Sequence, residues 1–313
     1  MKAKGRRCCI ILLALVVLLA CSAMTAYGAK KKKTKKKVKA KTKTVQVVAS
    51  ESNTWTTQSA IRTNSGTYNK VYRYNKDGVC TGYTNNEGTT SYTLNAAGFI
   101  TEEVTKAASG AMKYRTLYTR DSNGDPTQII YYENRTGFSK PARTETYTYY
   151  GKGAKKTRVA VDYEGGTITT TYDIYGNITE EIMQDSREHS KSTYTNILDS
   201  HHNPIKITER TEGSSGNYDT SSTSVTDITY QYDKSGNITK SDSKMSTVYS
   251  YGDTETITKT STAAYNKKGN PIKKSFYSKS VGNAGYEFID TDNITIKYKN
   301  VKVPKKYWHL YDD

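Results

Sequence analysis

The sequence contains few cysteines, and most of them lie near its start. Of the four cysteines in 313 residues, Cys8, Cys9 and Cys21 fall within the first 21 positions, and Cys80 alone follows. A lone cysteine cannot form an intrachain disulfide, so the body of the protein must fold without one, even where its compartment permits such bonds. Cys80 follows a turn motif, and we expect it to act as a small apolar strand residue rather than as a reactive thiol.

Aliphatic residues are also scarce, and helical periodicity is absent. Hydrophobic residues make up 35% of the chain, and the 28 tyrosines contribute much of that share. No long stretch repeats apolar residues at positions i, i+3, i+4 and i+7, which argues against a helical domain. The sequence also lacks a glycine-rich phosphate loop, a His-x-x-x-His pair and a nucleophile elbow. We therefore expect no catalytic site and no cofactor.

Residues 1–29 have the pattern of a signal peptide. Lys2, Lys4, Arg6 and Arg7 form a positively charged beginning, and an apolar run over residues 8–20 follows. A membrane-spanning helix needs about 20 apolar residues, so this shorter run fits a secretory signal. The signal predicts a mature protein outside the cytoplasm, either secreted or associated with the cell surface.

Two cleavage routes fit the end of this signal. Residues 26–28, Ala-Tyr-Gly, resemble the small-x-small site of a signal peptidase, whereas residues 18–21, Leu-Leu-Ala-Cys, resemble a lipobox. Cleavage at the lipobox would leave Cys21 as a lipidated N-terminus that anchors the chain to a membrane. Leucine at the second lipobox position is unusual, and cleavage at the other site would release the chain. Both routes stay open, with Cys21 as the candidate lipidation site.

A run of lysines without acidic residues follows the signal. Residues 30–44 read KKKKTKKKVKAKTKT and hold ten lysines, whereas the chain from Val45 onward holds 33 basic and 30 acidic residues. The formal net charge of +17 therefore comes mainly from the N-terminal segments, and the body is nearly neutral. Because the run has no apolar face and its charges repel one another, we expect a disordered, extended arm.

The lysine arm has three candidate roles. An exported polycation first meets anionic lipid headgroups or anionic polymers of the cell envelope, and each lysine near an anionic membrane contributes on the order of 1 kcal/mol. The arm could instead be a solubilising spacer. It lacks the interleaved aromatic residues and arginines of a nucleic-acid surface, which argues against that partner. We expect envelope association through Lys30, Lys31, Lys32, Lys33, Lys35, Lys36, Lys37, Lys39, Lys41 and Lys43.

One short phrase returns along the rest of the chain. It begins with tyrosine, continues with Asp or Asn and two variable residues, and ends with Gly, a small polar residue and a β-branched exit such as Ile-Thr. The Asp or Asn starts a turn by hydrogen bonding to nearby backbone, and the Gly takes the positive φ that the reversal needs. Tyr and Thr alternate with polar residues at period two, as in a strand with two distinct faces. Each phrase predicts a β-turn between antiparallel strands.

Two copies of the phrase, Tyr172-Asp173-Ile174-Tyr175-Gly176-Asn177 and Tyr232-Asp233-Lys234-Ser235-Gly236-Asn237, resemble the YD repeat of Rhs-type proteins, whose pattern is Tyr-Asp-x-x-Gly-Asn. The likeness covers roughly residues 68–275 and is degenerate outside these two copies. In the Rhs family, many such repeats form a large hollow β shell around a C-terminal toxin. This chain is too short for such a shell and shows neither its core motif nor a toxin domain, so the resemblance implies the local geometry alone. The repeat-turn residues are Tyr172, Asp173, Gly176, Asn177, Tyr232, Asp233, Gly236, Asn237, and, in a variant copy, Gly269 and Asn270.

The repeats predict an all-β domain over residues 45–313. We expect an antiparallel up-and-down meander of β-hairpins, roughly sixteen to twenty strands, as an extended, twisted sheet or an open barrel-like array. An open edge strand invites pairing with another chain, so the ends need covering. The segments near 45–67, with Trp55, and 286–313, with Trp308, are the candidate caps.

The histidines and turn carboxylates suggest sites that the repeat explains more simply. His201 and His202 lie beside Asp199, as in a metal or Ser-His-Asp site, but His202-Asn203 occupies the Gly-Asn position of a turn. Adjacent strand residues also point to opposite faces. The turns supply about one carboxylate each, short of the six to eight oxygens that calcium needs. We therefore expect no metal site.

The tyrosines leave two roles open. Their rows can form the buried core of the sheet, which we favour, or an exposed ladder that stacks on sugar rings or on partner side chains. Together with the signal, the composition predicts a non-enzymatic cell-surface protein whose β array binds an unidentified protein or glycan. The alternative is an Rhs-like export or toxin-associated carrier fragment.

Overall fold

A computed structural model describes residues 41–59, 62–134, 137–186, 188–215, 218–282 and 287–311. Within these ranges the chain forms 18 β-strands and the 3-10 helix η2. The elements are β1 (Thr42–Ser59), β2 (Arg62–Tyr74), β3 (Cys80–Asn85), β4 (Gly88–Leu94), β5 (Ile100–Ala107), β6 (Met112–Arg120), β7 (Pro126–Glu133), β8 (Arg143–Gly151), β9 (Ala154–Asp162), β10 (Thr167–Tyr172), β11 (Ile178–Gln184), β12 (Glu188–Leu198), β13 (Pro204–Ser215), β14 (Tyr218–Tyr232), β15 (Ile238–Tyr249), β16 (Thr254–Tyr265), β17 (Pro271–Gly282), β18 (Glu287–Pro304) and η2 (Lys305–Leu310).

The strands form one antiparallel meander that closes on itself. Each strand pairs with the next along the chain, and β1 also pairs with β18, from Thr42 opposite Pro304 to Ser59 opposite Phe288. The antiparallel meander confirms the sequence-based prediction, but the sheet is closed, neither extended nor open. Because β1 and β18 pair along nearly their full length, the two edges of an open sheet disappear. We call the resulting β-barrel the closed sheet.

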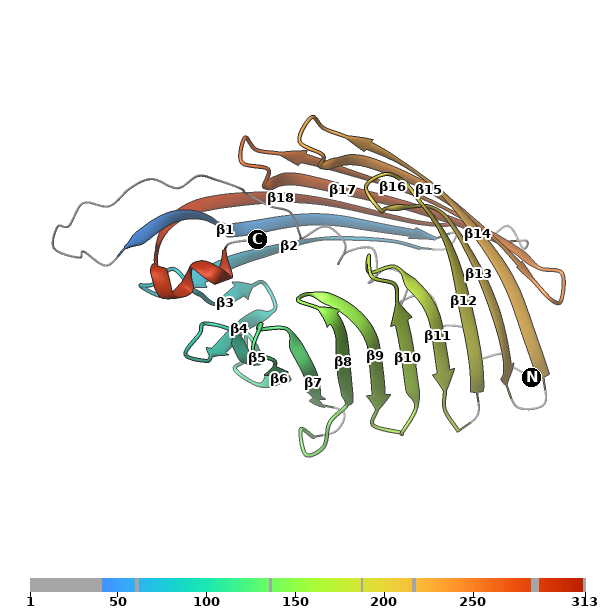
Figure 1. Cartoon of the computed structure of the whole chain (residues 1–313), viewed down its shortest axis with the longest axis horizontal. Helices are drawn as coiled ribbons and strands as arrows, with labels where there is room; N and C mark the ends of the chain where they lie inside the picture. Colours follow the sequence, from blue (N-terminus) through green and yellow to red (C-terminus); the bar gives the residue numbers. More distant parts are fainter. Residues whose placement is uncertain are drawn as a thin grey trace.

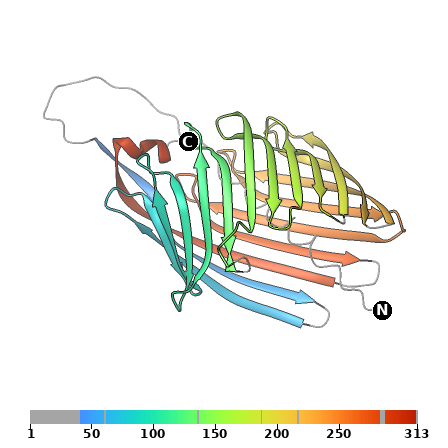
Figure 2. The same ribbon diagram turned by 90° about the horizontal axis from the view of Figure 1, so that it is seen from below.

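Two walls of different strand length make up the closed sheet. The long-strand wall consists of β12–β18, β1 and β2, whose strands have 11 to 18 residues. The short-strand wall consists of β3–β11, whose strands have 6 to 9 residues. Figures 1 and 2 show β1, β2, β17 and β18 running across the molecule and the short strands standing at a steep angle to them, and Figure 1 shows β12 and β13 standing steeply beside β11. The closed sheet is therefore asymmetric, although every strand follows the same up-and-down order.

One face of the sheet is turned inward all the way around. Residues opposite one another in antiparallel strands share a face, and pairs such as Tyr72–Tyr83 and Thr116–Tyr131 follow one face from strand to strand. Most of the buried side chains gather on that face, which identifies it as the inner one. They are Thr90, Thr116, Ile129, Glu145, Tyr147, Ala160, Thr170, Ser224, Thr247 and Ile296.

Part of the outer face of the long-strand wall is polar. It presents threonines in series along β16, at Thr256, Thr258 and Thr260. Thr260 Oγ1 donates a hydrogen bond to Asp242 Oδ1 at 2.7 Å, and Lys240 Nζ lies 2.7 Å from the other oxygen of the same carboxylate. Hydroxyl and charged groups of this kind keep their hydrogen bonds to water, so this part of the wall is hydrophilic, whereas Val71, Ile197 and Val248 are also exposed on the long strands.

Tyrosines and paired charges fill the inner face of the short-strand wall. The Glu145 side chain is 4% exposed. Its carboxylate accepts hydrogen bonds from the hydroxyls of Tyr131 and Tyr147 and from the guanidinium groups of Arg143 and Arg158. A buried carboxylate is tolerated when donors satisfy its oxygens, and four donors do so here. Burial raises the pKa of Tyr147, so its hydroxyl stays protonated and continues to donate.

The C-terminal segment covers part of one end of the closed sheet. Figure 1 shows η2 beside the start of β1. Trp308 Nε1 donates to Val303 O at 3.0 Å, and Tyr311 Oη donates to Gly78 O at 2.7 Å, which ties the segment to the turn after β2. The two segments predicted as caps instead lie mostly in β1, β2 and β18, where they close the sheet. Only the part after Pro304 lies across an end.

Among the residues that the structure describes, no helix is long and apolar enough to cross a membrane.

Candidate functional site

Turns of one design follow most of the even-numbered strands. Because successive strands run in opposite directions, all of these turns lie at one end of the closed sheet, which we call the turn end. The opposite end, which carries the other connections, is the loop end. A further turn of this design that begins with an aspartate, at Asp162, lies there, and the turns beginning at Ala107 and Tyr249 share its backbone hydrogen bonds. The turns at the turn end begin at Asn75, Asn95, Asp121, Asp173, Asp199, Asp233 and Asn266.

The turn at Asp173 shows the shared geometry. Asp173 Oδ1 accepts hydrogen bonds from the backbone amides of Tyr175 and Asn177, both at 2.9 Å. Gly176 N donates to Asp173 O at 3.1 Å, and Gly176 adopts a φ of 88°, which favours glycine. The side-chain amide of Asn177 donates to Asp173 Oδ2 at 3.0 Å. The Asp and the Asn of the repeat therefore hold each other across the turn.

The other predicted turn residues follow this geometry with one variation. In the second clean copy, Asn237 Nδ2 donates to Asp233 Oδ2 at 2.9 Å. This hydrogen bond, followed by those from backbone amides, lowers the pKa of Asp233. In the variant copy Gly269 again has a positive φ, of 79°, but Asn270 Nδ2 donates instead to Gln46 Oε1, at 3.1 Å. That contact ties the turn between β16 and β17 to β1.

Tyrosine hydroxyls clamp neighbouring strands together near the turn end. In each of these clamps a tyrosine on an even-numbered strand donates to a backbone carbonyl of the preceding strand, at 2.6 to 3.1 Å. In four of the five the acceptor is the first residue of its strand. The clamps satisfy carbonyls at the ends of strands and give these tyrosines a structural role. The donors are Tyr74, Tyr149, Tyr230, Tyr265 and Tyr298.

A second set of aromatic residues forms stacked pairs on the solvent-exposed surface of the turn end. The ring of Tyr175 lies on that of His202, with centroids 4.1 Å apart and planes at 10°. The ring of His201 lies on that of Tyr232 at 4.2 Å and 21°. These four residues, from the turns after β10 and β12 and from the end of β14, form what we call the aromatic sector. Tyr175 is 51% exposed and the neighbouring Ile174 is 61% exposed, so the sector faces solvent.

His202 adopts a backbone conformation that histidine disfavours. Its φ is 64°, in the position of the turn that glycine fills in the clean copies. The sequence analysis predicted this turn position for His202. A non-glycine residue in the left-handed region costs roughly 1 kcal/mol relative to glycine. Glycine would adopt this φ without strain, but the chain has instead a histidine whose ring stacks on Tyr175.

Hydrogen bonds fix the orientation of the second stacked pair. Tyr232 Oη donates to Asp199 Oδ2 at 2.5 Å, and Asn203 Nδ2 donates to Tyr232 Oη at 2.9 Å. Burial opposes ionisation of Asp199, but the hydrogen bonds from Tyr232 and from the amides of Asn203 and His201 outweigh it and lower the pKa of the carboxyl. Burial, followed by the hydrogen bond to Asp199, raises the pKa of Tyr232. At neutral pH the pair is therefore a phenol bonded to a carboxylate.

The remaining predicted residues are placed only in part. Tyr172 ends β10, and its carbonyl accepts a hydrogen bond from Tyr150 Oη at 3.1 Å. Lys41 and Lys43 lie at the start of β1, and Lys43 Nζ is 5.6 Å from the centroid of the Trp308 ring. Cys21 and the lysines from Lys30 to Lys39 lie outside the described residues.

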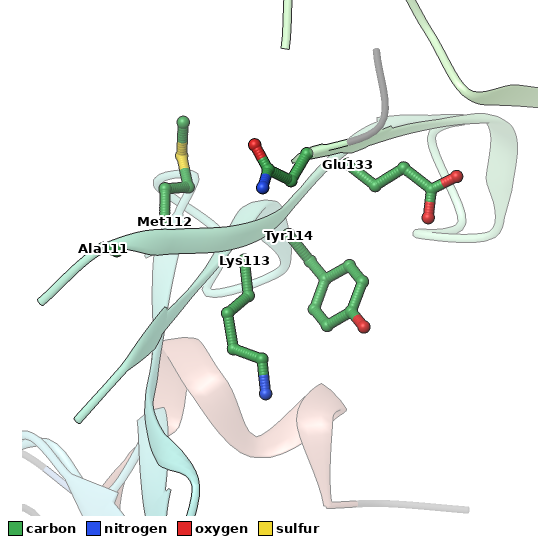
Figure 3. Close-up of a pocket in the computed structure, with 6 residues that line it drawn as sticks. Ala111, Met112, Lys113, Tyr114 and Glu133 are labelled. Carbon is green, nitrogen blue, oxygen red and sulfur yellow. The ribbon is translucent and has the colours of Figure 1, made fainter. Parts of the chain in front are cut away.

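A depression at the loop end is lined mainly by residues of β6 and β7. Figure 3 shows this depression, where Met112 and Lys113 point to opposite sides of β6 and Glu133 points away from Lys113. Lys113 Nζ instead pairs with Glu87, at 3.2 Å. Across the described ranges, no three His, Cys, Asp or Glu side chains come together as a metal site.

No known protein family matches the sequence, and no curated protein is similar to it. Among solved structures, the chain is similar to a porin-like protein from Bacteroides uniformis, with a TM-score of 0.35 and 16% identity, covering 80% of this chain and 96% of that one. It is also similar to OprB of Pseudomonas putida (0.31, 5% identity, 80% and 92% covered) and to a TcdB2-TccC3 structure (0.27, 11% identity, 71% and 17% covered). At these scores the similarities do not assign a function.

The sequence analysis missed the stacking of the aromatic sector. It assigned His202 to a turn but did not compare the second and third positions of neighbouring turns. Counted from the residue after the opening Asp, Tyr175 and His201 occupy the second position of their turns, and His202 occupies the third. Alternate connections of a meander lie at the same end, so aromatic residues at these positions in successive repeats are the signal that could have indicated the contact.

Proposed function

We propose that this chain is an exported, non-enzymatic β-repeat protein of the cell surface whose aromatic sector binds an extracellular carbohydrate polymer. In this proposal the lysine arm associates with the anionic envelope, through its polymers or its lipid headgroups. The closed sheet is the scaffold, because its turns present side chains from successive repeats along one end. Exposed aromatic rings stack on sugar rings at little entropic cost, since their side chains have few rotatable bonds.

The strained backbone at His202 carries the proposal. A turn that needs only to reverse the chain would have glycine at this position, as at Gly176 and Gly236. His202 keeps a φ of 64° and stacks on the half-exposed Tyr175. Strain that persists at a solvent-exposed contact points to a role outside the folding of the turn itself. The polar ring edges beside the stack supply hydrogen-bonding groups for sugar hydroxyls.

Binding of the exported chain to envelope polysaccharides tests this proposal. We expect Tyr175→Ala to weaken retention on the polymer that binds by about tenfold, since it removes a stacking surface worth roughly 1 kcal/mol and disorders its partner. The matched control is Tyr251→Ala, because Tyr251 is 59% exposed and stacks on Tyr249 at 5.3 Å, but lies at the loop end. Equal losses in the two variants, or no retention on any polysaccharide, would contradict the proposal.

A further inference from the structure

Exposed lysines gather on one part of the turn end, separate from the aromatic sector. They come from the chain before β1, the turn after β2, the turn between β16 and β17, strands β17 and β18, and η2. We call this group the lysine sector. Its members are Lys41, Lys76, Lys267, Lys268, Lys273, Lys297, Lys299, Lys302, Lys305 and Lys306.

Backbone contacts bring the segments of the lysine sector together. Lys305 N donates to Lys41 O at 3.0 Å, which joins η2 to the entry of β1. Lys302 lies opposite Thr44 in the pairing of β18 with β1. The turn that carries Lys267 and Lys268 is held against β1 by the hydrogen bond from Asn270 to Gln46. Closure of the sheet therefore brings together lysines that are more than 200 residues apart in the sequence.

The charges of the lysine sector are almost free of counter-charges. Among the described residues, one of the ten lysines forms an ion pair, Lys306 with Asp77 at 3.7 Å. Lys299 Nζ instead lies 4.6 Å from the centroid of the Tyr74 ring. Neighbouring cations with so few counter-charges repel one another, and an anionic surface would relieve that repulsion.

The loop end has the opposite charge. Exposed acidic residues line its connections, and the exposed bases described near it are Arg62, Lys106, Lys140 and Lys191. The nearly neutral total of the body therefore conceals a separation of charge between its two ends, which the sequence analysis did not predict. The exposed acidic residues of the loop end are Glu87, Asp162, Glu164, Asp185, Glu188, Asp219, Asp253 and Glu287.

We propose that the lysine sector docks on an anionic lipid bilayer and orients the closed sheet with its turn end toward the membrane. The sector spreads over six segments and consists of lysines alone, which are point charges without the fork that arginine offers to a single phosphate. A broad array of point charges fits a diffuse anionic surface, where each lysine contributes additively. The acidic loop end then faces away, because the same surface repels it.

The entry point of the lysine arm supports this orientation. The arm reaches the folded domain at Lys41, which is itself a member of the lysine sector. The arm and the sector therefore start from the same end and can contact one surface together. This inference rests on the proposed function only in taking the chain to be exported to the envelope; it does not depend on polysaccharide binding.

Vesicle sedimentation tests the docking surface with the full exported chain and with a second chain that lacks residues 30–39. The vesicles contain phosphatidylcholine alone or equal parts of phosphatidylcholine and phosphatidylglycerol. We expect Lys267→Gln/Lys268→Gln/Lys273→Gln to weaken binding to the anionic vesicles on the order of 10- to 100-fold in both chains. The control Lys106→Gln/Lys140→Gln/Lys244→Gln removes the same charge from exposed sites outside the sector and should change binding by less than about threefold.

The results of these measurements distinguish an anionic bilayer from a soluble polyanion as the partner. Equal effects of the two triple variants, or no effect of the first, would overturn the lysine sector as the docking surface. Soluble polyphosphate that binds the chain as tightly as the anionic vesicles would overturn the assignment to a bilayer. A lipid-borne quencher should quench a fluorophore at Asn300→Cys, within the sector, and not one at Ser250→Cys, at the loop end, each in a Cys80→Ser background. Failure of polysaccharide binding with these results intact would remove the proposed function alone.

Discussion

The two walls of the closed sheet hold their inner faces together with different chemistry. The short-strand wall uses large and charged groups, centred on Glu145 with Arg158 and Tyr147. The long-strand wall uses pairs of small hydroxyls, such as Ser224 with Thr247 at 2.9 Å, beside tyrosine–carboxylate pairs such as Tyr194 with Glu209 at 3.0 Å. A strand of six to nine residues makes fewer ladder hydrogen bonds than one of 11 to 18. Side chains therefore supply cross-strand contacts where the backbone supplies fewer.

Alkaline pH should have the largest effect on stability, because tyrosines dominate the inner face of the short-strand wall. Burial, followed by the charge of Glu103, raises the pKa of Tyr118 to about 12. A raised folded-state pKa gives stability that is complete below the unfolded value of about 10 and is lost as pH rises from there through the folded value. We expect cooperative unfolding between about pH 10 and 12. Tyrosinate absorbance and circular dichroism should change together; gradual ionisation without loss of strand signal would contradict the account.

Removing the central carboxylate of the short-strand wall should have the next largest effect. Glu145→Ala leaves Arg158, whose side chain is 17% exposed, without its carboxylate. Breaking a buried ion pair from one side costs about 3 to 5 kcal/mol of unfolding free energy. Urea denaturation checks this value. The control is Glu255→Ala in the long-strand wall, where the carboxylate accepts hydrogen bonds from Ser280 and Tyr249 and a loss of about 1 kcal/mol is expected.

A hydroxyl pair of the long-strand wall should respond in a different way. Ser224→Ala leaves the Thr247 hydroxyl buried without its partner, at a cost of about 1 to 3 kcal/mol. Replacing both, with Thr247→Val, removes the unsatisfied group, so the double variant should lose less than the sum of the two single variants. A double-mutant cycle from urea denaturation measures this coupling. Additive losses would show that the pair contributes nothing.

The tyrosine clamps should act equally in the two walls. Tyr149→Phe in the short-strand wall and Tyr298→Phe in the long-strand wall each remove one hydrogen bond to a backbone carbonyl, of 2.6 and 2.8 Å. We expect each to lower the unfolding free energy by about 1 kcal/mol. Thermal denaturation can compare the two variants directly. If the losses of unfolding free energy in the two variants differ by more than about 1 kcal/mol, the clamps stabilise one wall and are not a shared feature of the repeat.

The smallest effect should be a gain in stability. His202→Gly relieves the left-handed backbone at the aromatic sector and should raise the unfolding free energy by about 0.5 to 1 kcal/mol. The same variant should weaken polysaccharide retention, because Tyr175 loses its stacked partner. Unfolding and retention are measured on the same preparation. A lower unfolding free energy in His202→Gly would show that the histidine stabilises the turn.

The sequence predicted the local structure well, because turns and strands depend on residues close together in the chain. Asp173, Gly176 and Asn177 specify their turn within five positions. Closure could not be predicted in this way, since it depends on β1 finding β18, and an alternating pattern does not identify its partner strand. The stacking of the aromatic sector and the continuity of the lysine sector both depend on which strands are neighbours. They became visible only in three dimensions.

Closure is therefore the claim on which the rest depends, and a pair of cysteines across the closing strands tests it most directly. Ser52 and Thr295 are exposed and lie opposite each other in β1 and β18. Their Cβ atoms should lie about 5 Å apart, whereas Ser52 and the exposed Thr195 of β12 are several strands apart. In a Cys80→Ser background, Ser52→Cys/Thr295→Cys should oxidise to an intramolecular disulfide and Ser52→Cys/Thr195→Cys should not. Intermolecular disulfides alone in the first variant would contradict the closed sheet and indicate an open one.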